Sequence, residues 1–260
     1  MTSLKRLSGL LSPLLVSLFP TSPAHAVQLT YKLFVLGVPV AEAQMMVELN
    51  QTSYRMALNY KTTGLGSLMS GDHLEESTRG VLGADGPLPN EYFSTIHLHG
   101  QDRRMSLAYH GGTPTIVAID PPNESERENV PPAARAHTVD SLSATVAMIN
   151  FAARTGKCDL SLRTYDGRRL EAFSAHTSGE EDVPTSVHSD FAGRSLRCDY
   201  LAQPLAGFRI DTGRAEDAKV RQGTLWLAPL VPGLPRLPMR GEIDTRFLGR
   251  ATMYLTLVKP

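Results

Sequence analysis

Residues 41–62 read AEAQMMVELNQTSYRMALNYKT, and this stretch decides the fold. Apolar and polar side chains alternate through both of its halves, and the polar tripeptide Asn50-Gln51-Thr52 separates them. A period of two is typical of a β-strand with one buried and one solvent-facing side. A short polar connection is typical of a hairpin. The stretch therefore predicts two neighbouring strands of an antiparallel sheet.

The same alternation continues on both sides of this hairpin. Further strands are predicted at residues 29–35, 73–82, 91–99, 103–109, 114–119, 185–191, 195–203, 207–211, 221–228, 239–247 and 250–258. Asp166-Gly167 is the strongest hairpin signal in the chain. As a two-residue turn, it pairs Tyr165 with Arg168 and places Leu160 opposite Phe173.

One segment, residues 141–155, has the spacing of a helix instead of a strand. Asp140 is placed to act as its N-cap, and Gly156 is placed to end it. The side chains expected on its buried face are Leu142, Val146, Ile149 and Ala153. The chain is therefore predicted to be mainly β, a single large curled antiparallel sheet (a β-spiral or incompletely closed barrel) covered by this one helix.

Composition narrows the class of protein. The chain is 42% hydrophobic and carries 26 basic against 26 acidic side chains, which argues against a disordered chain and against a nucleic-acid-binding protein. An outer-membrane barrel is disfavoured because aromatic residues are only 7% of the chain and the predicted strands are short. We expect residues 27–260 to form a single β-rich domain.

Residues 1–26 have the pattern of a secretory signal peptide. Lys5 and Arg6 precede an apolar stretch, residues 7–19, and Ala24-His25-Ala26 provides the small residues of a cleavage site. The alternative, a retained membrane anchor, is disfavoured because this stretch is too short to span the hydrocarbon core. We expect cleavage after Ala26, export to the periplasm, and no integral membrane segment afterwards.

The two cysteines, Cys158 and Cys198, suit such an oxidising compartment, and we expect them to form a disulfide. We place the bond between the strand that enters the Asp166-Gly167 hairpin and a later strand beside it, because adjacent strands bring Cα atoms within disulfide range.

In these features the chain resembles an exported bacterial family known only as domain of unknown function 3108 (DUF3108). The resemblance rests on the order and spacing of Tyr31–Gly37, Tyr60–Leu65, Gly83–Pro89, Asp140–Ser143, Tyr165–Arg169, the two flanking cysteines, and Trp226. It covers nearly the whole chain after the leader and implies no established activity. More loosely, it implies the half-barrel sheets of periplasmic β-spiral and lipoprotein-carrier proteins, which is an analogy of fold only.

Few residues suggest catalysis or metal binding. His137, Asp140 and Ser141 supply the groups of a nucleophilic hydrolase, but no Gly-x-Ser-x-Gly elbow is present and helix capping already explains Asp140. His97 and His99 point the same way on a strand and are the only weak metal candidates, because a third ligand is not evident. The acidic runs Glu75-Glu76 and Glu180-Glu181-Asp182 are predicted to be hydrated.

No phosphate-binding loop is present, so no cofactor is expected. Three hypotheses about function remain. The first is a non-enzymatic envelope protein that binds a lipid, a lipoprotein or a protein partner. The second is a hydrolase that uses the cluster at residues 137–141. The third is a purely structural or scaffolding envelope protein.

Overall fold

The structure, a computed structural model, describes residues 25–69, 71–98, 100–245 and 249–260. Apart from its last two residues, the expected leader lies outside this part of the chain, as does His99. Within it, no helix is both long and apolar enough to cross a membrane.

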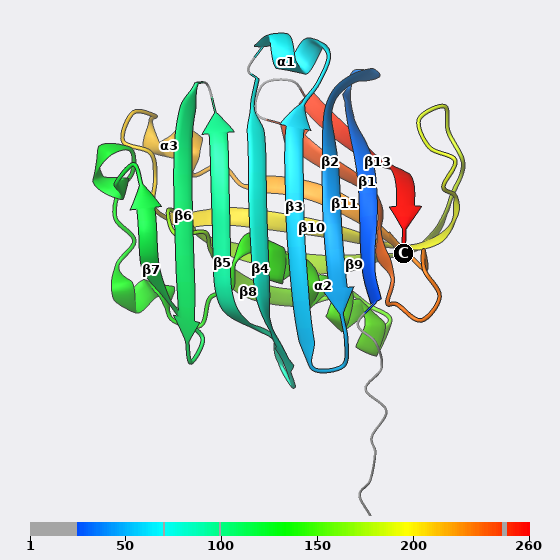
Figure 1. Cartoon of the computed structure of the whole chain (residues 1–260), viewed down its shortest axis with the longest axis horizontal. Coiled ribbons are helices and arrows are strands. Elements are labelled where there is room, and N and C mark those ends of the chain that lie inside the picture. Colours follow the sequence, from blue (N-terminus) through cyan, green and yellow to red (C-terminus); the bar gives the residue numbers. More distant parts are fainter. Residues whose placement is uncertain (1–24, 70, 99, 246–248) are drawn as a thin grey trace, which may run out of the picture.

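Antiparallel strands make up most of the molecule (Figure 1). They are β1 (His25–Val35), β2 (Val38–Leu49), β3 (Ser53–Thr62), β4 (His73–Gly83), β5 (Gly86–Leu98), β6 (Gln101–His110), β7 (Thr113–Asp120), β8 (Leu160–Tyr165), β9 (Leu170–Val183), β10 (Gly193–Ala206), β11 (Arg221–Ala228), β12 (Leu237–Thr245) and β13 (Gly249–Lys259). The helices are α1 (Leu65–Met69), α2 (Ser141–Thr155) and α3 (Arg214–Asp217), and short 3-10 turns cover Asn123–Ser125 and Pro132–Arg135.

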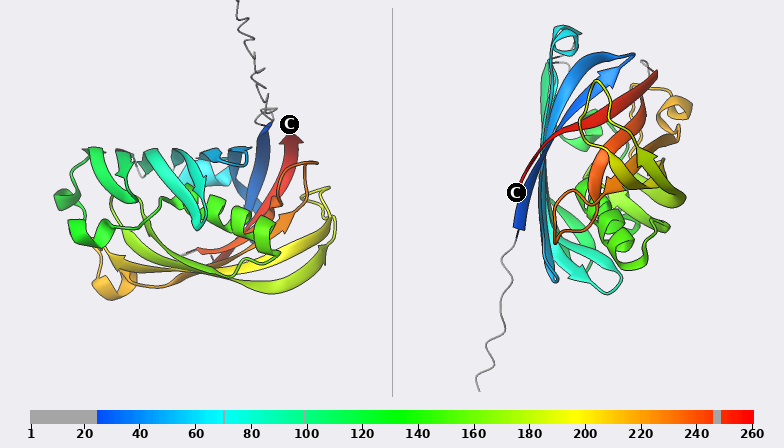
Figure 2. Two further views of the ribbon diagram at one scale, coloured as in Figure 1. Left: turned by 90° about the horizontal axis from the view of Figure 1, so that it is seen from below. Right: turned by 90° about the vertical axis from the view of Figure 1, so that its right-hand side faces the viewer.

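The 13 strands form one sheet in the order β7-β6-β5-β4-β3-β2-β1-β13-β12-β11-β10-β9-β8. The first and last strands pair at its centre, while β7 and β8, which follow one another in the chain, form its two edges. The sheet curls so that its two arms cross, with α2 lying between them (Figure 2). The predicted fold, a curled antiparallel sheet with one covering helix, is confirmed.

The interior is filled by side chains. One cluster joins residues of β1–β3 on one arm to residues of β11–β13 on the other, through Leu142, Val146 and Ile149 of α2. The alternation read in residues 41–62 is the basis of this cluster, because Ala43, Met45 and their neighbours two residues on all point inward. Helix α2 thus binds the two arms together.

Helix α2 begins and ends at the predicted residues. The Asp140 carboxylate accepts a hydrogen bond from the Ser143 amide at 2.8 Å, and Gly156 ends the helix in the left-handed region with φ of 70°. Ala153, however, is exposed instead of buried, because Ala152 and not Ala153 faces the interior in the last turn of the helix.

Three local predictions were wrong. Residues 185–191 and 207–211 form no strand, since β9 and β10 are longer than expected and take up the pairing. The β8–β9 turn has four residues, so Tyr165 pairs with Leu170 and Leu160 with Ala175. The Asp166 carboxylate causes this shift by accepting from the amides of both Arg168 and Arg169, at 2.8 and 2.6 Å.

Cys158 and Cys198 are joined in a disulfide with a Cα–Cα distance of 5.9 Å. The strand beside Cys198 is β9, not β8, because Cys198 pairs with Thr177. Cys158 lies before β8 begins, and its amide bonds the Thr177 hydroxyl at 2.9 Å. The expected placement on adjacent strands is therefore corrected: the bond links the segment after α2 to a strand two places away.

Candidate functional site

The candidate triad does not assemble. Ser141 donates to Glu76 at 3.3 Å, and the Asp140 oxygens accept from Ser143 and Thr78. His137 is exposed and has a φ of 56°, and within the described part of the chain no hydrogen bond joins it to Asp140 or Ser141. The geometry of a Ser-His-Asp triad, in which each group bonds the next, is thus absent from these residues.

A different polar cluster lies under the N-terminal end of α2. Its first part surrounds Asp140, whose carboxylate accepts from the Thr78 hydroxyl at 2.9 Å and the Ser143 hydroxyl at 2.6 Å. Ser143 in turn bonds the Tyr54 hydroxyl at 2.7 Å. These bonds join the helix end to β3 and β4 through side chains that are all buried.

The second part of the cluster surrounds Glu76. This carboxylate on β4 accepts from the Tyr92 hydroxyl at 2.9 Å as well as from Ser141. Burial raises the pKa of Glu76 to about 7, and the neighbouring charges of Asp166 and Asp140 raise it further against the lowering effect of the Tyr92 bond. Glu76 is half-buried and so is less hydrated than predicted, whereas its neighbour Glu75 is exposed, as predicted.

Burial also raises the pKa of Asp140, although its bonds to Ser143 and Thr78 oppose the shift. Two neighbouring carboxyl groups thus both favour their protonated forms relative to water. Such a pair can hold a proton near neutral pH, but Glu76, Tyr92 and Ser143 bond one another or their neighbours and do not line the apolar pocket described below. The cluster is a filled junction between helix and sheet.

The metal candidates are only partly described. His97 stacks on His73 with ring centroids 5.0 Å apart, and its Nδ1 lies 2.6 Å from Asp102. Among the described residues no group of three or more His, Cys, Asp or Glu is arranged to hold a metal ion. His99 lies outside them.

The other acidic run is paired with basic and aromatic groups. Arg236 lies 2.6 Å from Glu180, and the Trp226 indole donates to Glu181 at 2.9 Å.

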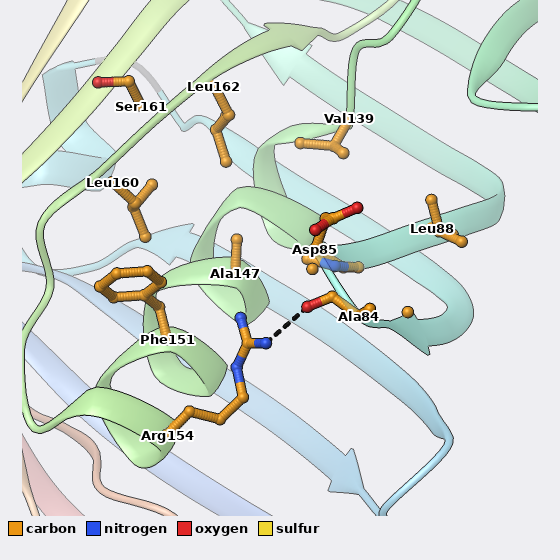
Figure 3. Close-up of a pocket in the computed structure, with 13 residues that line it drawn as sticks. Ala84, Asp85, Leu88, Val139, Ala147, Phe151, Arg154, Leu160, Ser161 and Leu162 are labelled. Carbon is orange, nitrogen blue, oxygen red and sulfur yellow. Dashed lines mark hydrogen bonds between the residues drawn. The ribbon is translucent and has the colours of Figure 1, made fainter.

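An apolar pocket lies toward the C-terminal half of α2 (Figure 3). Three elements form its wall: the β4–β5 turn, the helix, and the first half of β8. Its volume is about 240 Å³, and its apolar lining includes Leu88, Val139, Ala147, Phe151, Leu160 and Leu162.

The rim of this pocket is formed by the β4–β5 turn and by the side chain of Arg154. Gly83 pairs with Gly86, which leaves a tight turn at Ala84 and Asp85. Arg154, in the last turn of α2, donates to the Ala84 carbonyl at 2.6 Å and so ties the helix to the turn. The rim thus carries one guanidinium and one carboxylate above an apolar floor.

Sequence reasoning missed this pocket, because its walls come from residues far apart in the chain. Each wall was predicted separately: the turn, the helix and the strand. Their approach depends on how strongly the sheet curls, and no local pattern encodes that curvature.

Comparisons with known proteins agree with the architecture. The profile of the family described as "Protein of unknown function (DUF3108)" matches residues 27–256. Among solved structures, the chain resembles a β-barrel-like protein of domain of unknown function DUF1849 from Brucella abortus, with a TM-score of 0.50 and 12% identity over 90% of this chain and 97% of that one. At that identity the likeness shows the fold alone. No curated protein sequence matches the chain.

Proposed function

The chain belongs to the DUF3108 family, and we propose that it is an exported, non-enzymatic binding protein of the cell envelope. In this proposal the apolar pocket beside α2 holds the apolar end of a lipid, a lipoprotein or a protein partner. The observation that carries the proposal is the open, apolar pocket beside a helix whose other side is packed in the core.

The size of the pocket limits what enters it. Small-molecule sites usually have volumes of about 300–1,000 Å³, whereas this pocket has about 240 Å³. It therefore suits a fragment, such as the end of an acyl chain or one apolar side chain, with the rest of the partner outside. Transfer of that fragment out of water would supply the affinity.

The expected leader supports an envelope location, and we propose that the protein acts in the periplasm after cleavage behind Ala26. N-terminal sequencing of the exported protein should find Val27 first. Detection of Met1 on the exported protein would contradict this part of the proposal.

Binding can be tested with dodecanoate as the probe, by titration calorimetry. Ala147→Phe places a ring in the pocket and should weaken dodecanoate binding at least about tenfold, which is about 1.4 kcal/mol. Ala153→Phe is the matched control, because it makes the same change on the exposed side of the same helix. Equal binding by both variants, or no binding by the wild type, would contradict the proposal.

The hydrolase hypothesis keeps one specific residue, since Ser141 is exposed and bonds a carboxyl group with a pKa of about 7. We propose that the Ser141–Glu76 hydrogen bond is structural. It ties the first residue of α2 to β4, next to the bond by which the Asp140 side chain caps the helix. Ser141→Ala should therefore leave unchanged any activity found with the purified protein. An activity that Ser141→Ala abolished without a change in melting temperature would favour the hydrolase.

A further inference from the structure

Strand β8 is an edge of the sheet, and part of that edge is open. The C-terminal half of β8 is occupied by Val139. The Val139 amide donates to the Arg163 carbonyl at 3.0 Å, and the Val139 carbonyl accepts from the Tyr165 amide at 2.8 Å. Backbone groups of alternate strand residues point to the same side. The amide and carbonyl of Ser161 therefore point outward like those of Arg163 and Tyr165, and no partner for them is found among the described residues.

The open edge adjoins the apolar pocket. Leu160 and Leu162, on either side of Ser161, line the pocket together with Ala147 and Phe151 of α2, and Ser161 lies beside them on the strand (Figure 3). An edge that offers backbone groups beside an apolar pocket has the two components of β-strand addition. Main-chain bonds supply affinity, and pockets for alternate side chains supply specificity.

We propose that the partner is a protein that presents an extended segment, which pairs with β8 at Ser161 and inserts one apolar side chain into the pocket. This inference rests on the proposed function and specifies its partner. The bound segment bonds the amide and carbonyl of Ser161 with its own backbone, and one of its residues projects on the same face as Leu160 and Leu162.

The backbone of the edge strand, and not the pocket volume, favours a peptide over a free lipid at this place. A pocket of about 240 Å³ takes one large side chain as readily as the end of an acyl chain, but the methylene groups of an acyl chain cannot bond the Ser161 amide and carbonyl. The edge also accepts a backbone segment already, since Val139 is seated on it in parallel with Thr164. The added segment would continue the line of Val139 along the same edge.

The test uses a phage-displayed library of short linear peptides selected on the full chain, followed by calorimetry with the enriched peptides. Ser161→Pro removes the amide donor at an edge position where proline is tolerated, and it should weaken peptide binding at least about tenfold. Ser161→Ala keeps the amide and should bind as the wild type does. Ala147→Phe should weaken both peptide and dodecanoate binding, whereas Ser161→Pro should spare dodecanoate.

Hydrogen exchange separates peptide binding from a general change in stability, because binding slows exchange at one outward-facing amide and a change in stability affects many amides. On peptide binding, the Ser161 amide should exchange at least about tenfold more slowly, while the Leu160 and Leu162 amides, which face β9, should change little. The proposal is overturned if selected peptides bind Ser161→Pro as well as Ser161→Ala. It is also overturned if no peptide is enriched while dodecanoate still binds, a result that leaves the proposed function standing. Failure of both probes would overturn both.

Discussion

The N-terminal end of helix α2 is joined to the sheet by a network of hydrogen bonds, whereas its C-terminal half borders an open apolar pocket. Asp140, Ser141 and Ser143 all bond sheet residues or their own helix end, and none of the three lines the apolar pocket. Toward the other end, Ala147 and Phe151 face a space of about 240 Å³. The same helix thus fastens the two arms of the sheet at one end and leaves room for a partner at the other.

The C-terminal half of α2 is held by packing and, just after the helix, by a covalent bond. Met148 and Ala152 are buried in a cluster that includes both cysteines. Cys158 lies two residues beyond Gly156 and is tied to β10 through Cys198. The difference between the two ends teaches that a helix can border an open pocket on one side when its other side is fixed by close packing and by a nearby crosslink.

The largest effect should come from breaking this crosslink. Cys158→Ser opens a loop whose ends are 40 positions apart, and chain entropy predicts a loss of about 4 kcal/mol in the free energy of unfolding. Reductant should destabilise the wild type by a similar free energy, seen as a lower melting temperature, and should not destabilise the variant further. Alkylation of both thiols in the undenatured, exported protein would contradict this account.

The N-terminal end should respond to pH instead. The pKa of Glu76 is about 7 in the folded chain against an ordinary value of 4.5, so the folded state binds the proton more tightly than the unfolded state does. The contribution of Glu76 to the free energy of unfolding is therefore largest at low pH, and it is lost as the pH rises from about 5 through 7. Between pH 5.5 and 8 we expect a loss of about 2 kcal/mol in urea unfolding.

Glu76→Gln is the matched control, since the neutral amide keeps the shape and removes the titration. Its stability should change by about 2 kcal/mol less than that of the wild type over the same pH range. Parallel stability curves for the two proteins would contradict the assignment of the effect to Glu76.

A smaller loss is expected at the cap itself. Asp140→Ala removes the acceptor for the Ser143 amide and should lower the free energy of unfolding by about 1–2 kcal/mol. Asp140→Asn, which keeps an acceptor oxygen, should lose much less. Equal losses for the two variants would show that the charge, and not the cap, matters.

The smallest effect is expected at the pocket rim. Arg154 is exposed, and its bond to the Ala84 carbonyl lies at the surface. Arg154→Ala should therefore change the free energy of unfolding by less than about 0.5 kcal/mol. A loss of several kcal/mol in thermal unfolding would mean that the C-terminal half of α2 is held by this bond, contrary to the comparison drawn here.

The part of this picture that local patterns encode was predictable. Alternation predicted the strands, and Asp140 with Gly156 predicted both ends of α2, because capping and period depend on neighbours in the chain. The β8–β9 register was not predictable from Asp166-Gly167, since the Asp166 carboxylate bonds two amides and lengthens the turn. Glu76 was taken for a hydrated residue because its burial depends on Tyr92 and Ser141, which are distant in sequence.

The most direct test of the central claim is a methyl NMR titration of the protein with dodecanoate, because it reports on both ends of α2 at once. The account predicts shifts for the methyl groups of Leu88, Ala147, Leu160 and Leu162, which line the pocket. It predicts no shifts for Leu142, which is buried near the N-terminal end. Shifts centred on Leu142, or none at Ala147 and Leu160, would contradict it.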